Sequence, residues 1–329
     1  MEKKPIRNRV KTFFNRVALA SVVVAGLSVH QAQAQQESMY SQYMFNTLAL
    51  NPAYAGSRDV LSMTALYRRQ WIGIEGAPTT QTFTADMPLN KERIGLGMQL
   101  FNDQIGAQRS TGAYASYAFR VKVSRRTTLA LGLQAGATNF RWDLASVNAG
   151  AADPVFSQNV NKWLPNFGTG IYISNDKAYF GVSVPSLIRG KLNEYSRSDS
   201  ARQQRHYFLM AGFVMRLGNS LHLKPSVLFK GVQGAPVAFD ANLNLWIKNR
   251  IAVGASYRTG NLKFNNDKIS GGKLGDAIVG LIEVQLNDQL RFGYAYDYML
   301  NDLKKESHEI MLRYEFGFSK SKILTPRYF

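Results

Sequence analysis

Apolar and polar residues alternate along most of this chain after residue 58, and this pattern constrains the fold more than any other feature. In 237–248 and 290–298, every second residue is apolar and most residues between them are polar or small. Side chains two positions apart share one face of a β-strand, so the pattern indicates strands with one apolar face. The alternation predicts an all-β fold of about fourteen antiparallel strands, near 59–71, 79–89, 93–101, 110–123, 127–141, 164–174, 178–188, 204–217, 221–231, 236–248, 250–260, 273–287, 289–300 and 308–318.

The connections between these strands favour a closed membrane barrel over a soluble sandwich. Connections after even-numbered strands are tight, as at 90–92, 124–126 and 218–220. Connections after odd-numbered strands are mostly longer, at 72–78, 102–109, 142–163, 189–203, 261–272 and 301–307, and the link near 233–235 is the short exception. Short turns at one end and longer loops at the other are typical of outer-membrane barrels, whereas a Greek-key sandwich has no reason to alternate in this way. An open sheet would leave unpaired backbone groups in lipid, so we expect the strands to close into a ring.

Composition is consistent with this fold. The chain has no cysteine, which excludes disulfides, thiolate metal sites and a cysteine nucleophile. Every apolar run after residue 34 is interrupted within a few residues, so no later segment is a candidate membrane helix. Aromatic residues make up 12% of the chain, as suits interfacial girdles. The net charge of +18 indicates contact with outer-membrane lipid or acidic partners and no nucleic acid, because we expect the protein to be exported.

The first residues are typical of a cleaved secretory signal peptide. Basic residues dominate 1–16, an apolar run follows from Val17 to Val29, and Ala32-Gln33-Ala34 forms a small-x-small cleavage pattern. The alternative is an uncleaved membrane anchor, but the run is shorter than the ~20 residues that a spanning helix needs. No cysteine follows the run, which excludes lipoprotein processing. We predict a signal peptide at 1–34 and localisation in the cell outer membrane.

Residues 35–58 do not alternate and are rich in tyrosine, asparagine and small residues. Asn51-Pro52 and Ala55-Gly56 are turn signals, and Ser41 to Leu50 could form a short helix that ends at the Asn-Pro step. We predict an N-terminal leader or plug segment at 35–58, a β-barrel at 59–318 and a C-terminal tail at 319–329.

The leader carries a specific string, QYMFN followed by LNPAYAG. It resembles the start of the PorP/SprF family, outer-membrane components of the type IX secretion system. The matching residues are Gln42, Tyr43, Phe45, Asn46, Leu50, Asn51, Pro52, Ala53, Tyr54, Ala55 and Gly56. Further matches are Tyr67, Arg68, Gln70 and Trp71, and the likeness then continues more loosely over the remaining chain.

The resemblance implies a FadL-like barrel that takes part in export or cell-surface attachment of a partner protein. The implied partners are a secreted adhesin-like protein with a type IX C-terminal domain and secretion-system components of the periplasm and outer membrane. None of this follows from periodicity or charge.

The leader supplies one set of candidate partner or plug contacts: Gln42, Tyr43, Asn46, Asn51, Pro52, Tyr54 and Gly56. These residues either plug the lumen or bind a periplasmic partner, or they form a packed leader that is needed only for folding. Both alternatives are open, because a polar segment inside a barrel satisfies its backbone groups there.

A second set of candidate contacts lies toward the outer rim. Arg68 and Trp71 stand near the end of the first predicted strand, and we favour an interfacial pair at the lipid headgroups over contact with a surface partner. The loop 142–163 is the longest, and its Trp142, Phe156 and Trp163 could dock a protein partner. The alternative is a loop that folds inward or covers the surface.

Charged residues also fall on inner strand faces: Asp240, Arg291, Asp297, Arg313 and Glu315. They could line a conduit, but we favour a buried ion network that bridges strands. Inner glycines are expected to relieve crowding as the sheet curves, at Gly132, Gly136, Gly168, Gly170 and Gly293.

Catalysis has little support in the sequence. Ser307, His308 and Glu309 are contiguous, but neighbouring residues of a strand point to opposite faces and cannot serve one site. No GxSxG, HExxH, P-loop or dinucleotide motif is present. We predict no enzymatic activity, no catalytic residue, no cofactor and no metal site. The leading hypothesis is a binding scaffold for an exported protein, and the rival is a FadL-like channel for small apolar molecules.

Overall fold

The computed structural model describes residues 43, 46–90, 92–143, 159–191, 202–233, 237–262, 277–300 and 304–316. These residues belong to one compact unit, Ala34–Phe329. The predicted signal peptide, the predicted tail and the candidate residues Gln42 and Phe156 lie outside the described residues. Among the described residues, no helix has the length and apolar character needed to cross a membrane.

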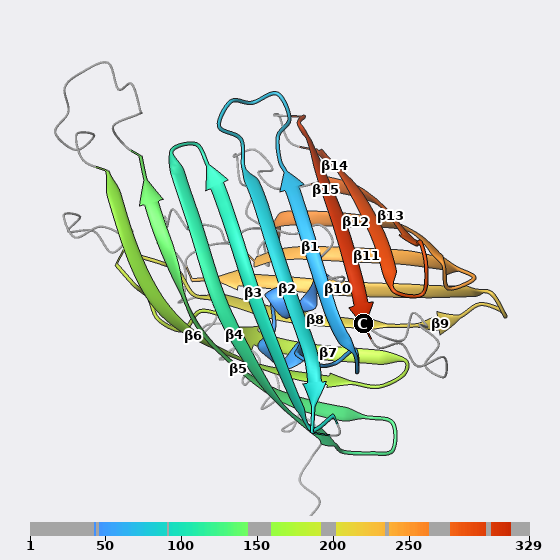
Figure 1. The fold of residues 1–329 in the computed structure, drawn as a ribbon. Helices are drawn as coiled ribbons and strands as arrows, with labels where there is room; N and C mark the ends of the chain where they lie inside the picture. Colours follow the sequence, from blue (N-terminus) through green and yellow to red (C-terminus); the bar gives the residue numbers. More distant parts are fainter. Residues whose placement is uncertain are drawn as a thin grey trace, which may run out of the picture. The chain divides into compact units, whose positions relative to one another are not determined.

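The strands form a single antiparallel ring (Figure 1). Each strand pairs with its neighbour in the sequence, β15 pairs with β1, and β10 pairs with β11, so the order returns to its start. Both β8 and β9 pair with β10 and are separated by Val214 alone, so they form one interrupted strand and the ring has fourteen. The strands are β1 (Leu61–Arg69), β2 (Thr79–Leu89), β3 (Ile94–Ile105), β4 (Gln108–Lys122), β5 (Thr128–Trp142), β6 (Val160–Ser174), β7 (Ala178–Val184), β8 (His206–Phe213), β9 (Met215–Arg216), β10 (Leu221–Val232), β11 (Val237–Ile247), β12 (Ile251–Leu262), β13 (Ala277–Gln285), β14 (Leu290–Met299) and β15 (Glu306–Phe316).

The faces of this barrel are reversed relative to a soluble protein. Along β4, buried and exposed residues alternate, and the exposed positions include Tyr117, Phe119 and Val121. The buried positions of the ring are mostly polar or charged, as for Gln134, Asn242 and Glu309. This arrangement places apolar side chains against lipid and polar side chains in the lumen, which explains the period of two in the sequence.

The predicted asymmetry of the connections is confirmed at most positions. The end that carries the long loops is called the outer end below, because outer-membrane barrels place them outside the cell.

The predicted long loop at 102–109 is wrong. Strands β3 and β4 are joined by Gly106 and Ala107 alone, and Gly106 has a positive φ of 54° that suits a tight turn. Alternation of hydrophobicity stops there because polar pairs such as Thr111 and Asn102 continue the ladder beyond the apolar belt.

The predicted strand 178–188 is also shorter than expected. Strand β7 ends at Val184 because Pro185 has no backbone N–H to donate to a ladder. The chain then stays beside β6 through other bonds. The Leu187 N–H donates to the Phe167 carbonyl, and the Asn166 amide donates to the Ile188 carbonyl over 2.9 Å.

Candidate functional site: the leader inside the barrel

The leader lies in the lumen and packs against the inner wall. Its described residues include the short 3-10 helices η2 (Thr47–Ala49) and η3 (Pro52–Tyr54), and η3 contacts β4, β5 and β6. The single helix predicted for Ser41 to Leu50 is therefore wrong within the described residues. Asn51 caps η3 with its side chain and Pro52 begins it, so the Asn-Pro step starts a new turn and does not merely end an earlier helix.

Asn51 connects the leader to two strands of the wall. Its side-chain oxygen accepts a hydrogen bond from the Ala53 N–H, and its amide donates to the carbonyl of Ile171 in β6 over 3.0 Å. A longer contact of 3.5 Å reaches the Val182 carbonyl in β7. The residue is fully buried, so each of these bonds satisfies a group that would otherwise lack water.

Other side chains fix the leader at points around the ring. The Thr84 hydroxyl of β2 donates to Asn46 over 2.9 Å, and the Asn242 amide of β11 donates to the Tyr43 hydroxyl over 2.8 Å. The Ser183 hydroxyl donates to the Leu50 carbonyl, and the Gly56 N–H donates to Asp86. Strands from several parts of the ring therefore hold one short segment.

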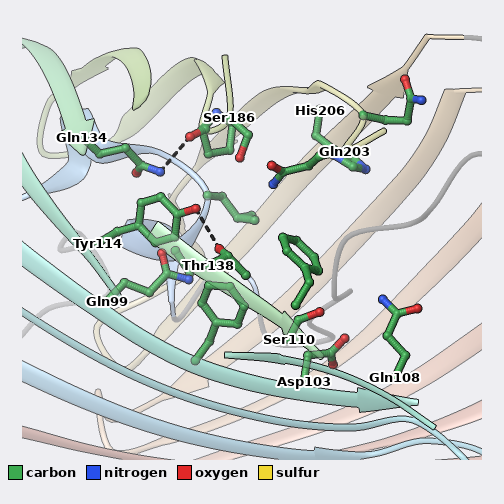
Figure 2. Close-up of a pocket in the computed structure, with 16 residues that line it drawn as sticks. Gln99, Asp103, Gln108, Ser110, Tyr114, Gln134, Thr138, Ser186, Gln203 and His206 are labelled. Atoms are coloured by element: carbon green, nitrogen blue, oxygen red, sulfur yellow. Dashed lines mark hydrogen bonds between the residues drawn. The ribbon is translucent and has the colours of Figure 1, made fainter. Parts of the chain in front are cut away.

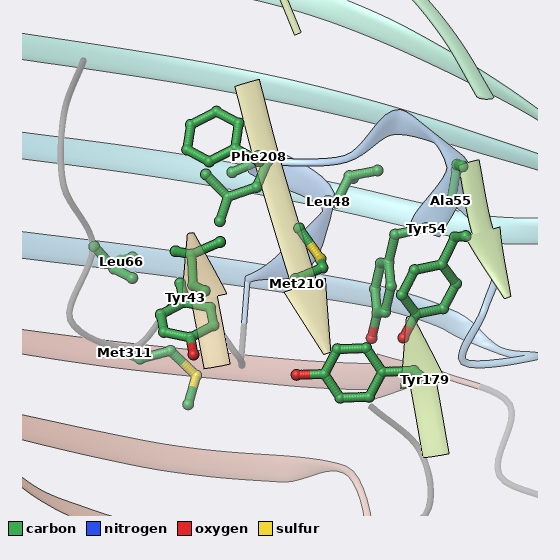
Figure 3. Packing of buried hydrophobic residues seen from close by; sticks show 14 of the residues in the cluster. Tyr43, Leu48, Tyr54, Ala55, Leu66, Tyr179, Phe208, Met210 and Met311 are labelled. Carbon is green, nitrogen blue, oxygen red and sulfur yellow. The ribbon is translucent and has the colours of Figure 1, made fainter. Parts of the chain in front are cut away.

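Apolar and aromatic contacts complete this attachment (Figure 3). Tyr54 meets Tyr172 edge to face, with ring centroids 5.4 Å apart, and Tyr172 stacks on Tyr179 at 5.8 Å. Leu48 belongs to the same buried cluster as Met210 of β8. The core of this barrel is thus centred on the leader, because the strands turn most of their own apolar side chains toward lipid.

Glycines form the part of the wall where the leader lies. A Cβ added at Gly95 or Gly132 would collide with the backbone of Ala55 or Ala53, and one at Gly170 would collide with the Asn51 side chain. A Cβ at Gly97 would lie 3.0 Å from Leu48. At these positions, glycine allows the leader to approach the wall closely. The sequence predicts only that inner glycines relieve crowding where the sheet curves.

The predicted inner charges form ion pairs. Arg68 reaches Asp297 at 2.7 Å and Glu309 at 3.2 Å, and its side chain is 2% exposed. Arg258 joins Asp297 to Asp240, at 3.3 and 2.8 Å respectively. These residues form one connected network toward the outer end, with members in β1, β11, β12, β14 and β15.

A second group of ion pairs lies toward the opposite end of the ring. Arg291 pairs with Glu283 at 3.0 Å, and Arg58 of the leader pairs with Glu315 at 2.8 Å. The guanidinium of Arg313 donates to the Thr64 hydroxyl. A buried network is therefore the better description of these residues than an open conduit.

The predicted rim residues are distributed over different faces. Arg68 points into the lumen, so its expected contact with lipid headgroups is wrong, because position 68 shares the inner face of β1 with Leu66 and Thr64. The Trp71 N–H donates to the Ser307 hydroxyl just beyond β1. Whether Trp71 meets a partner stays a prediction.

The two described tryptophans of the predicted loop 142–163 both lie in strands. Trp142 ends β5, and Trp163 lies within β6, so the loop is shorter than predicted. Trp163 is 64% exposed and shares the outer face of β6 with Phe167, as expected of an interfacial aromatic residue.

A cavity of about 120 Å³ lies on the outer side of the leader (Figure 2). Ala49 and Leu50 of the leader contribute to its lining, together with inner residues of β3, β4 and β5. No metal-binding group of three or more histidine, cysteine or acidic residues occurs in the part of the chain that the structure describes. His308 bonds to the Tyr294 hydroxyl and lies on the opposite face of β15 from the fully buried Glu309, so they do not share a site, as predicted.

Several residues of the site were not among the candidates. Arg258 and Glu309 lie on inner faces, and the alternation along β12 and β15 could have identified them. Arg58 could not be found in this way, because its pairing with Glu315 depends on where the leader lies. The same holds for Gly181, where an added Cβ would lie 2.9 Å from the side-chain nitrogen of Asn51.

A closed ring with an apolar exterior and a polar, leader-filled interior defines an integral outer-membrane β-barrel. The family model of the "Type IX secretion system membrane protein PorP/SprF" matches residues 32–314. The chain therefore belongs to the PorP/SprF family, and the predicted resemblance is confirmed. A comparison with curated proteins finds no match.

Solved structures of outer-membrane barrels are similar to this chain at low sequence identity. A TodX monoaromatic hydrocarbon channel mutant has a TM-score of 0.49 and 10% identity over 83% of this chain and 94% of its own. A FadL homologue of Pseudomonas aeruginosa has a TM-score of 0.45 and 12% identity, with coverage of 81% and 93%. Omp33 of Acinetobacter baumannii has a TM-score of 0.42 and 8% identity, with coverage of 78% and 98%.

Proposed function

We propose that this protein assists export or surface anchoring of an adhesin-like protein by binding it, with the barrel as a rigid scaffold in the membrane. Family membership supports a role in type IX secretion. The observation that carries the binding mechanism is the leader, which is bonded to β2, β6, β7 and β11 inside the lumen. A segment held in this way favours a scaffold over a conduit for a polypeptide.

In this proposal, the outer loops contact the exported protein and the end with short turns faces secretion components of the periplasm. Trp142 is the described candidate next to the outer loop 143–159, at the end of β5. The predicted signal peptide at 1–34 would deliver the chain to the outer membrane. The absence of enzymatic activity is part of the same proposal.

The rival function, a channel for small apolar molecules, has weaker support. The cavity beside the leader is lined by glutamines and hydroxyl groups as well as aromatic rings. Apolar ligands prefer sites with mostly apolar walls. Uptake of an apolar solute that depends on this protein would favour the rival.

The test is a pull-down of the tagged full chain from native membranes in a gentle detergent, followed by mass spectrometry. We expect a secreted protein with a type IX C-terminal domain and secretion components to be recovered. Trp142→Ala should lower recovery of the exported protein, whereas Trp163→Ala on the lipid-facing side of β6 should not. Recovery of lipid and abundant membrane proteins alone would contradict the proposal.

A further inference from the structure

The cavity on the outer side of the leader has the features of a small-molecule site. Strand β4 begins at Gln108 beside this cavity, which places the cavity toward the outer end. Figure 2 shows Gln99, Ser110 and Tyr114 on one side of it and Gln203 and His206 on the other. Ligand sites commonly combine a concave wall with a few convergent polar groups in this way.

Five of the eleven polar side chains in its described lining are glutamines. Each amide offers both donors and an acceptor, so a group of them suits a ligand that also donates and accepts. The Gln134 amide donates to the Pro185 carbonyl over 2.9 Å, which holds that side chain in place. Among the described residues, no hydrogen bond of the protein occupies the side chains of Gln99 and Ser110, although both are buried.

The charge of the cavity argues for a neutral ligand. Its described lining contains no lysine or arginine, so an anionic ligand would find no cation to pair with. Its single carboxylate, Asp103, already accepts a hydrogen bond from Thr80 over 2.5 Å. The other titratable groups of the described lining are His206 and the phenol of Tyr114, which bonds the Thr138 hydroxyl.

The aromatic lining and the volume of the cavity further restrict the class of ligand. Phe101 and Tyr114 stack with ring centroids 6.3 Å apart and planes within 13° of each other, and Phe140 also lines the cavity. A ring with C–H groups on its faces packs on such aromatics while its hydroxyls reach the amides. The volume of about 120 Å³ is of the same order as the ~150 Å³ cavity that accepts benzene, so the cavity can enclose at most one six-membered ring.

We propose that this cavity binds one neutral pyranose ring, either a free sugar or the end unit of a surface glycan. Glutamines and hydroxyls bond the sugar hydroxyls, and Phe101, Tyr114 and Phe140 contact its C–H faces. The inference is independent of the proposed role in secretion, because it rests on the cavity alone.

The test measures sugar binding to the purified full chain. The detergent must lack a sugar headgroup, so an amine oxide is used in place of a glucoside or maltoside. The probes are methyl glucoside, methyl galactoside, methyl mannoside and N-acetylglucosamine, followed by saturation-transfer NMR and calorimetric titration. Toluene and acetate serve as apolar and anionic comparisons. We expect saturable binding of at least one sugar.

Two variants in the lining and one control outside it locate the site. Gln99→Leu removes an amide from the lining and should weaken binding about tenfold or more, because the sugar hydroxyls then lose their partner. Gln104→Leu, on the same strand but exposed outside the cavity, should leave binding unchanged. Ser110→Phe should fill the cavity and abolish binding. Each variant must retain the heat-modifiable migration of a folded barrel.

The proposal is overturned if no sugar saturates, if Gln99→Leu binds as tightly as Gln104→Leu, or if toluene displaces the bound sugar. Competition with an oligosaccharide that ends in the same sugar distinguishes a free sugar from the end unit of a glycan as the natural ligand. Competition indicates a glycan end, whereas binding of the free glycoside alone indicates a soluble sugar.

Discussion

At the scale of single residues, this protein depends on buried charges that occur in pairs or larger groups. Arg68 bonds two carboxylates, those of Asp297 and Glu309. Desolvation makes a buried ion pair a weak source of net stability, but removal of one partner leaves a charge buried without compensation. The network therefore specifies which strands face each other more than it adds to stability.

Arg68→Met should destabilise the folded barrel by about 3–5 kcal/mol, because it leaves two buried carboxylates without this guanidinium. The measurement is urea unfolding in lipid vesicles, followed by tryptophan fluorescence. Lys122→Met is the matched control, since Lys122 pairs with Glu92 at 3.5 Å with its side chain 68% exposed. We expect Lys122→Met to lower the free energy of unfolding by less than about 1 kcal/mol. If both variants lost the same free energy of unfolding, the buried ion pairs of Arg68 would matter no more than an exposed pair.

At the scale of elements, the leader and the wall around it are complementary. The LNPAYAG string places Asn51 between β6 and β7, Tyr54 on Tyr172, and Ala53 against Gly132. The sequence identified this string as a specific motif, but its packing depends on glycines in strands that are distant in the sequence. A side chain at those positions would occupy the space of the leader backbone.

Gly132→Leu should displace the leader, because its added Cβ would collide with the Ala53 backbone. Overpacking costs about 1–3 kcal/mol, which corresponds to a rise of roughly 5- to 150-fold in the population with the leader displaced. The chain has no cysteine, so Thr47→Cys, at a position that is 5% exposed, introduces one reporter whose maleimide labelling rate is measured.

Gly280→Leu is the control for this prediction, because nothing lies within 4 Å of a Cβ at that position. Its labelling rate should equal that of the protein with the reporter alone. A rate that does not change in Gly132→Leu would mean that the leader is not held at this wall.

At the scale of the whole molecule, the barrel is stable only where lipid covers its exterior. Leu131, Leu133 and Phe167 are each about half exposed or more, on neighbouring strands. Such a surface in water would be an aggregation site, whereas in the outer membrane it anchors the ring. Among the strands that the structure describes, the closed order also leaves no free edge for pairing with another chain.

Leu133→Arg should destabilise the barrel in membranes by about 2–4 kcal/mol, since position 133 lies near the middle of β5 on the lipid side. Leu217→Arg, which lies beyond the end of β9 and is similarly exposed, should cost about 0–1 kcal/mol. Reversible folding into vesicles measures both. If the cost at 217 matched that at 133, the apolar exterior would not be the membrane-facing surface.

Alternation determined most strands and their inner and outer faces, because lipid and lumen impose opposite solvents on neighbouring residues. The closed ring followed only when the short and long connections were added to this pattern. Alternation also predicted the inner positions of Asp240, Asp297 and Glu315. The tertiary structure alone decided that Arg68 faces the lumen ion network, that Gly106 turns a two-residue hairpin, and that the leader lies against a wall of glycines. The positions of Arg68 and of the leader depend on contacts between residues far apart in the chain, and no local pattern records which distant side chain fills a given space.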